Sequence, residues 1–120
     1  MEDTFRMDDA TTALELAALI RDHRGEDVIV MDLREINYWT DFFVVATVSS
    51  NTHLQGLQRH IKDYAREKGM EILRGRRKTK ANDGWNLTDL GNIVIHLMSA
   101  NSRSFYELER LWSTAKIISS

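Results

Sequence analysis

The stretch DFFVVATV, residues 41–48, decides the fold that the sequence predicts. Its apolar residues are mostly aromatic or β-branched, and they run together without the apolar–polar alternation of a strand that has one wet face. Strands that are covered on both faces have this composition. The preceding run DVIVMDL, residues 27–33, has the same character. We therefore predict two central strands of a sheet, at 27–33 and 41–48.

An amphipathic helix is predicted on each side of these two strands. The first helix begins at Thr12, which fits a capping box with Glu15, and it ends at Gly25. The second helix follows the capping residues 49–51 and ends near Gly69. Its apolar stripe has helical spacing and is predicted to pack on the sheet; the stripe consists of Leu54, Leu57, Ile61 and Tyr64.

The second half of the chain adds three strands and a helix to the prediction. MEILR, residues 70–74, favours a short strand. WNLTDLGNIVIHLM, residues 85–98, favours a hairpin whose turn uses Gly91 for an unusual backbone angle. The segment 102–118 has apolar residues at helical spacing, namely Phe105, Leu108, Trp112 and Ala115. The order αββαβββα predicts an α/β fold with a mixed sheet of about five strands covered by helices.

The composition is that of a single domain spanning residues 1–120. The hydrophobic fraction of 42% and the charged fraction of 28% are ordinary for a soluble globular protein. The absence of cysteine excludes disulfides, thiolate metal sites and a cysteine nucleophile. No apolar run is long enough to span a membrane, and the acidic start lacks the pattern of a signal peptide. We therefore expect a cytoplasmic protein.

The stretch RGRRKTK, residues 74–80, concentrates positive charge in a chain whose formal net charge is −2. Its basic residues are Arg74, Arg76, Arg77, Lys78 and Lys80, which leaves 11 of the 16 basic residues to face 18 acidic ones. An acidic body repels phosphate backbones at long range, so any RNA contact is expected to be local. The stretch has no interleaved aromatic residue, and it is either a loop that contacts phosphates or a solvated charge run.

Three aspartates, Asp32, Asp41 and Asp89, fall at or near predicted strand ends. Carboxylates at such positions can hold Mg²⁺ for nucleotidyl transfer. However, the chain has no glycine-rich phosphate loop and no Asp-x-Asp pair. Asp89 is instead suited to hydrogen-bond the backbone of the predicted turn. A nucleotidyltransferase is therefore an alternative without a supporting motif, and we predict that the protein is not an enzyme.

The histidines predict neither a metal centre nor a catalytic base. His53 and His60 lie near one helical face, but no third ligand is in register with them. His96 sits within an apolar strand, where a neutral, hydrogen-bonded imidazole is the common case. We therefore predict no metal and no cofactor.

Trp85 and Tyr106 are the candidates for an exposed aromatic surface. Trp85 shares one strand face with Leu87 and Asp89, because side chains alternate along a strand. Tyr106 is rotated by about 100° from the neighbouring residue of the predicted buried stripe. Tryptophan and tyrosine often dominate the energy of protein–protein binding, which suggests a docking surface. The alternative is that both are half-buried core residues, and the pattern leaves both interpretations open.

Four segments, in this order, resemble the ribosomal silencing factor family, also called the Iojap-related family, over about residues 8–115. They are TDFFVVA at 40–46, a W-x-x-x-D-x-G pattern from Trp85, IVIH at 93–96, and a match to R-x-F-Y-x-L-E-x-L-W from Arg103. Each segment alone is weak evidence for the family, whereas all four segments in the expected order and at the expected spacing make the match specific. The basic stretch is more basic than is usual in the family, and Asn92 replaces a common aspartate.

The resemblance implies a noncatalytic, usually homodimeric α/β domain with a nucleotidyltransferase-like sheet. It also implies a translation repressor that binds ribosomal protein L-fourteen at the inter-subunit face of the large ribosomal subunit and prevents the small subunit from joining. The partner-binding residues that it implies are Trp85, Asp89, Arg103, Tyr106 and Glu109. The alternative is an RNA-binding ribosome-assembly factor, and in either case the basic stretch is a candidate for an auxiliary rRNA contact.

Overall fold

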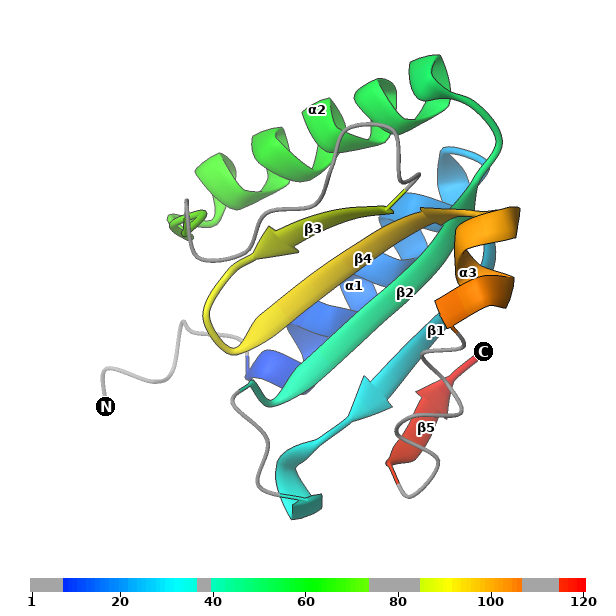
Figure 1. Cartoon of the computed structure of the whole chain (residues 1–120). Helices are drawn as coiled ribbons and strands as arrows, with labels where there is room; N and C mark the ends of the chain where they lie inside the picture. Colours follow the sequence, from blue (N-terminus) through cyan, green and yellow to red (C-terminus); the bar gives the residue numbers. More distant parts are fainter. Residues whose placement is uncertain (1–7, 37–39, 74–84, 107–114) are drawn as a thin grey trace.

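The computed structural model describes residues 8–36, 40–73, 85–106 and 115–120, with the side chains of residues 105 and 106 excepted. Figure 1 shows a twisted sheet with helices packed against it. The described elements are α1 (Asp9–Asp22), β1 (Glu26–Asp32), the 3-10 helix η2 (Arg34–Ile36), β2 (Phe42–Val48), α2 (Asn51–Glu67), β3 (Trp85–Asp89), β4 (Ile93–Ser99), α3 (Ala100–Tyr106) and β5 (Lys116–Ser119). Within these elements, no helix combines the length and the apolar character that crossing a bilayer requires.

The five strands form one mixed sheet in the order β3-β4-β2-β1-β5. β2 and β4 are parallel, and the other neighbouring strands are antiparallel. All seven residues of β2 are buried, because the strand has a neighbour on each edge and covered side chains on both faces. The predicted α/β class and the central placement of the strands at 27–33 and 41–48 are confirmed. The nucleotidyltransferase-like detail stays a prediction.

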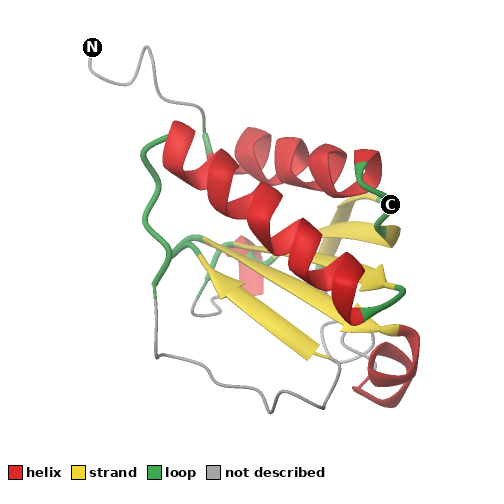
Figure 2. Cartoon of the chain, turned by 90° about the horizontal axis from the view of Figure 1, so that it is seen from above, coloured by secondary structure: helices red, strands yellow, loops and turns green. Residues whose placement is uncertain are grey.

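One face of the sheet, here called the helix face, is covered by α1 and α2. Figure 2 shows the two helices lying together over the sheet. Alternate strand residues such as Phe42, Val44 and Ile95 point to this face because of the two-residue period of a strand. They pack with the helix residues Leu16, Ala17, Ile20, Leu57 and Ile61, which recur at helical spacing.

The other side of the sheet, here called the opposite face, carries a second apolar cluster. It contains Met31, Leu33, Phe43, Val45, Val94 and Met98, with Trp85 and Leu87 partly buried against it. The short helix α3 lies over this face, because its Arg103 reaches Thr47 of β2, which points there. Alternate residues of the same strands thus pack against α1 and α2 on one face and lie under α3 on the other.

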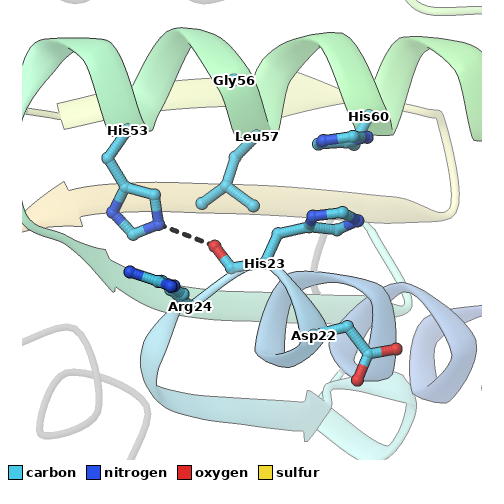
Figure 3. Close-up of a pocket in the computed structure, with 7 residues that line it drawn as sticks. All are labelled: Asp22, His23, Arg24, His53, Gly56, Leu57 and His60. Atoms are coloured by element: carbon cyan, nitrogen blue, oxygen red, sulfur yellow. Dashed lines mark hydrogen bonds between the residues drawn. The ribbon is translucent and has the colours of Figure 1, made fainter.

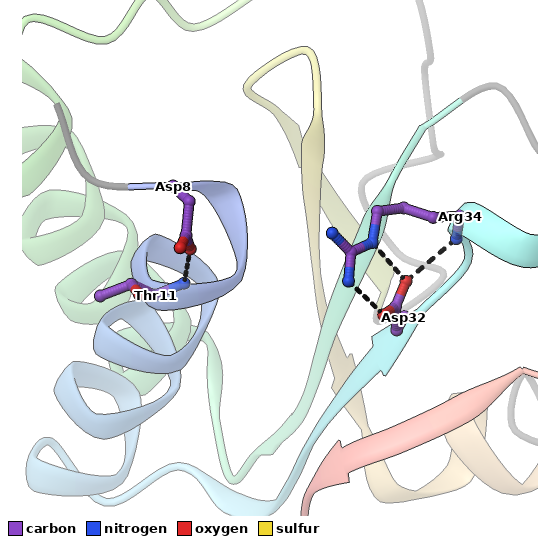
Figure 4. Close-up of polar contacts among 4 residues, drawn as sticks. All are labelled: Asp8, Thr11, Asp32 and Arg34. Atoms are coloured by element: carbon purple, nitrogen blue, oxygen red, sulfur yellow. Dashed lines mark hydrogen bonds and ion pairs between the residues drawn. The ribbon is translucent and has the colours of Figure 1, made fainter. Parts of the chain in front are cut away.

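The N-terminus of α1 differs from its prediction. The cap is Asp8, whose Oδ1 accepts the backbone N–H of Thr11 at 2.7 Å (Figure 4). This hydrogen bond from the Thr11 backbone is the main cause that lowers the pKa of Asp8. The predicted capping box of Thr12 and Glu15 is wrong, because Thr12 is a buried residue within the helix. A carboxylate also suits the positive end of the helix dipole.

The predicted boundaries of α2 and of the hairpin are confirmed. Ser50 caps α2 by accepting the N–H of His53 at 3.0 Å, and the helix is followed by Gly69 with a φ of 70°. In the hairpin, Gly91 has a φ of 96°, the left-handed conformation that the turn requires. β3 pairs with β4 from Trp85 opposite Met98 to Asp89 opposite Val94.

Two predicted elements are wrong. The segment 70–73 forms no strand beyond a single bridge, in which the N–H of Leu73 bonds the carbonyl oxygen of Asp89 at 2.8 Å; Arg74 lies outside the described residues. The last helix is described only over Ala100–Tyr106, and its predicted end at 116–118 is instead part of β5. There residues 116, 117 and 119 pair with β1, and the two β-branched residues 117 and 118 suit a strand.

Candidate functional site

Trp85 is a half-buried residue at the start of the edge strand β3, on the opposite face. Its indole packs against the second apolar cluster. The indole Nε1–H donates a hydrogen bond to Nδ1 of His96 at 3.1 Å, and the two ring centroids are 5.8 Å apart. The predicted aromatic residue is therefore neither sealed in the core nor fully exposed, and its polar atom is bonded inside the protein.

His96 is a buried imidazole with 2% of its surface exposed. Phe43 meets it edge-on, with ring centroids 4.4 Å apart. Burial lowers the pKa of His96 to about 3, so the ring is neutral at physiological pH. Because Nδ1 accepts the indole N–H, the ring proton must sit on Nε2, which has no hydrogen-bond partner in the described structure. The lowered pKa agrees with the predicted neutral state, and the predicted hydrogen bonding is present at one of the two ring nitrogens.

Asp89 lies at the far end of β3, on the same face as Trp85. It is 3% exposed, and its Oδ1 accepts the N–H of Gly91 at 2.8 Å. The predicted hydrogen bond to the turn backbone is thus confirmed. Asp89 lies four residues after Trp85 along the strand, which is about 13 Å at the usual rise. A direct contact of this carboxylate with a partner stays a prediction.

Arg103 fastens α3 to the sheet. It is 9% exposed, and its Nη1 donates to Oγ1 of Thr47 at 2.9 Å. The backbone N–H of Ser102 also bonds Oγ of Ser99 at 3.1 Å, at the junction of β4 and α3. The role in partner binding that the resemblance implies for Arg103 is untested, and its contacts here are structural.

The remaining predicted site residues lie outside the described structure. They are the side chain of Tyr106, the whole of Glu109, and the basic residues Arg74, Arg76, Arg77, Lys78 and Lys80. The described part of α3 nevertheless contains the start of the motif that begins at Arg103. α3 starts two residues after Met98, and Met98 pairs with Trp85, so Trp85 and α3 occupy the same end of the sheet.

Two of the three carboxylates that could have served a nucleotidyl transfer, Asp32 and Asp89, form hydrogen bonds within the protein. Asp32 accepts two hydrogen bonds from the guanidinium group of Arg34, at 3.0 and 2.8 Å, as Figure 4 shows. The side-chain hydrogen bond from Arg34 is the main cause that lowers the pKa of Asp32. Asp89 serves the turn. No group of three or more histidine, aspartate or glutamate side chains in the described ranges is arranged to hold a metal ion.

A cavity of about 240 Å³ between the end of α1 and α2 was not predicted (Figure 3). The rings of His23 and His60 are stacked there with centroids 3.6 Å apart. His53 accepts the Ser49 N–H at Nδ1 and contacts the His23 carbonyl oxygen with Nε2 at 2.9 Å. The sequence spacing of His53 and His60 placed them near one helical face. His23 comes into contact with them only because α1 packs against α2. These contacts join the two helices; the other lining residues are Asp22, Arg24, Gly56 and Leu57.

The comparisons with known proteins agree with the sequence motifs. The family model described as "Ribosomal silencing factor during starvation" matches residues 7–120. The ribosomal silencing factor of Treponema pallidum is 38% identical over 100 residues, covering 83% of this chain and 88% of that protein. A crystal structure of a Chromobacterium violaceum protein superposes with a TM-score of 0.76 at 26% identity and covers 88% of both chains.

A more distant relative comes from an organelle. The mouse protein named "Mitochondrial assembly of ribosomal large subunit protein 1" is 32% identical over 82% of this chain, which spans 43% of that protein. The family match therefore covers the strands, helices and motifs described above. The chain belongs to the ribosomal silencing factor family.

Proposed function

We propose that this protein binds the large ribosomal subunit at its inter-subunit face, through ribosomal protein L-fourteen, and represses translation by blocking the small subunit. The family match over residues 7–120 carries the proposal, because it covers the whole domain rather than one motif. The name of the mouse relative, which refers to the large subunit, supports that subunit as the target.

The geometry of the opposite face supports a docking site at the end that holds Trp85 and α3. Trp85 is half-buried on an edge strand, so part of a large aromatic ring is accessible while the rest is anchored in the cluster. Arg103 and Thr47 hold α3 beside it. A rigid aromatic residue on a fixed support is the arrangement in which tryptophan contributes most to protein–protein binding.

Steric exclusion needs no chemical step. If the factor and the small subunit cannot occupy the large subunit together, the apparent dissociation constant for joining rises by a factor of 1 + [factor]/Kd. A factor concentration of ten times Kd therefore weakens joining about elevenfold. The hydrogen-bonded carboxylates of Asp32 and Asp89 fit a protein that acts by binding alone.

Co-sedimentation with separated ribosomal subunits tests the proposal. We expect the protein to sediment with large subunits and not with small ones, and to reduce joining in proportion to its bound fraction. Trp85→Ala should weaken the association by about 30-fold, which corresponds to the 2 kcal/mol typical of a dominant interface residue. Leu14→Ala is the matched control, because it removes an apolar side chain that is 40% exposed on α1.

Two results would contradict the proposal, the first its docking face and the second its target subunit. One is an association with large subunits that Trp85→Ala and Tyr106→Ala both leave unchanged. The other is equal sedimentation with small subunits. If only Leu14→Ala weakened binding, the docking surface would lie on α1 rather than on the opposite face.

A second candidate function is that of an RNA-contacting factor in ribosome assembly. The name of the mouse relative includes assembly, and the stretch 74–80 holds five basic residues. If the stretch makes Z contacts with RNA phosphates, the logarithm of the association constant should fall with log[salt] at a slope of about −0.7Z to −0.9Z. Replacing Arg76, Arg77 and Lys78 by glutamine should flatten that slope. If the triple variant showed the same salt dependence as the wild type, the stretch would be solvated and would not contact phosphates.

We also propose that the protein is a homodimer, as the resemblance implies. Sedimentation equilibrium over a range of protein concentrations would measure the dimer constant directly. A monomer at all concentrations would contradict this part of the proposal and leave the docking face untouched.

A further inference from the structure

We propose that His96 is a positioning residue of the docking face: it accepts the Trp85 N–H and so fixes the plane in which the indole meets a partner. The proposal rests on the proposed function of Trp85 as a docking residue. It adds a second residue, buried and without direct access to the partner, to the recognition machinery.

The orientation of the indole depends on two linked contacts. The Nε1–H bond to His96 Nδ1 is 3.1 Å long, and it spans from β3 to β4. Phe43 of β2 meets the imidazole edge-on, which limits rotation of that ring. Because His96 is itself fixed, the hydrogen bond also limits rotation of the indole about its own side-chain bonds.

Burying an imidazole at this position costs desolvation free energy. His96 is 2% exposed, and its Nε2 lacks a hydrogen-bond partner among the described residues. An apolar ring of similar size would avoid the desolvation of both nitrogens. What histidine contributes and an apolar ring cannot is the acceptor at Nδ1. The pKa of His96, lowered to about 3 by burial, keeps that acceptor available throughout the physiological range.

The internal bond also restricts the chemistry of the partner. The indole N–H is the only hydrogen-bond donor of the ring, and it is used inside the protein. A partner therefore meets carbon atoms and the π face. Aliphatic stems and the cationic heads of lysine or arginine suit such a surface, whereas a lone carbonyl acceptor gains nothing there.

Two substitutions separate positioning from packing. His96→Phe keeps an aromatic ring, somewhat larger than imidazole, and removes the acceptor. His96→Asn loses volume and places a side-chain oxygen near the position of Nδ1. We expect His96→Asn to be the less stable protein in urea, because it leaves a cavity. We expect His96→Phe to be the weaker binder of large subunits, by about fivefold, since one hydrogen bond is lost.

The indole resonance of Trp85 in a ¹H–¹⁵N spectrum is the direct readout. Trp85→Phe identifies it among the three tryptophans of the chain. In His96→Phe the resonance should move upfield and its hydrogen should exchange faster with solvent. In His96→Asn both properties should stay near those of the wild type, and affinity should stay within about twofold.

The proposal is overturned if the Trp85 resonance is unchanged in His96→Phe, or if affinity follows stability so that His96→Asn binds worst. Failure of the proposed function looks different. In that case the indole signals would behave as described, while neither Trp85→Ala nor His96→Phe would alter the association with large subunits.

Discussion

The two faces of the sheet are built from alternate residues of the same strands, yet they differ in chemistry. The helix face is buried mainly by apolar side chains, with Thr12 of α1 as a buried polar residue beside them. The opposite face combines an apolar cluster with buried polar groups, namely Thr47, Asp89, His96 and Arg103. Burying polar groups opposes folding unless hydrogen bonds compensate. The helix face is therefore stabilised mainly by apolar burial, whereas the opposite face also depends on hydrogen bonds of its buried polar groups.

Ile95 and His96 are neighbours on β4 that point to different faces, and they give the sharpest test of this contrast. Ile95 is fully buried under the helices. Ile95→Ala should lower the free energy of unfolding by about 4 kcal/mol, through lost burial and a residual cavity. Urea unfolding measures the loss. The fraction that stays folded should bind large subunits as the wild type does, and a selective loss of binding would show that the two faces are not separate.

The loss of stability at acidic pH should report on the buried imidazole of His96. In the unfolded chain the imidazole takes up a proton near its ordinary pKa of 6.5, whereas in the folded protein that pKa is about 3. Protonation thus favours the unfolded chain, and stability is lost as the pH falls from 6.5 toward 3. Between pH 6.5 and about pH 4 the wild type should lose about 3 kcal/mol more than His96→Phe does. Parallel pH profiles of the two proteins would contradict a buried neutral imidazole.

Asp89 tests whether the far end of the opposite face is structural. Asp89→Ala removes the buried acceptor for the N–H of Gly91 in a partly buried turn and should cost about 2 kcal/mol of unfolding free energy. Asp89→Asn keeps a side-chain oxygen and should cost less than half as much. Thermal unfolding of both variants checks the order. If Asp89→Asn lost ribosome binding while remaining stable, the carboxylate would belong to the interface.

Thr47 tests the support of α3. Thr47→Val keeps the shape of the side chain and removes the acceptor for Nη1 of Arg103. We expect a loss of about 1 kcal/mol in unfolding free energy, because Arg103 keeps its other contacts. Hydrogen exchange of the α3 amides should speed up more than that of α1. Equal effects on both helices would mean that the contact does not act locally.

The smallest effect is expected at Asp32, whose partner Arg34 is largely exposed to solvent. The pKa of Asp32 lies below its ordinary value of 3.8, so the ion pair stabilises the protein above that pH. Asp32→Asn should cost less than about 1 kcal/mol at neutral pH. The difference from the wild type should disappear as the pH falls through the lowered pKa. A difference that persists at lower pH would point to the hydrogen bonds rather than the charge.

Local patterns in the sequence predicted the parts of the fold whose causes are local. The apolar run 41–48 implied a strand buried on both faces, and Gly91 marked the turn of the hairpin. β5 was missed because Ile117 and Ile118 fit a helical stripe as well as a strand. What decides between them is the pairing with β1, at residues 30–32, which no local pattern encodes.

The candidate site was predictable only in outline. Alternation placed Trp85 and Asp89 on one face, as the structure confirms. The bond between Trp85 and His96 depends on the register of β3 and β4 and on the side-chain angles, so the sequence offered no signal for it. The stacking of His23 on His60 likewise depends on how α1 and α2 pack.

The pairing of β5 with β1 joins Val30 to Ser119, across most of the length of the chain. Closing so long a loop loses more entropy than forming the hairpin does, so this short strand is expected to add late in folding. Whenever it detaches, the backbone donors and acceptors along β1 become available to any other strand, including β5 of a neighbouring molecule. At high protein concentration, this fold is therefore expected to be prone to domain swapping, in which copies of the protein exchange β5.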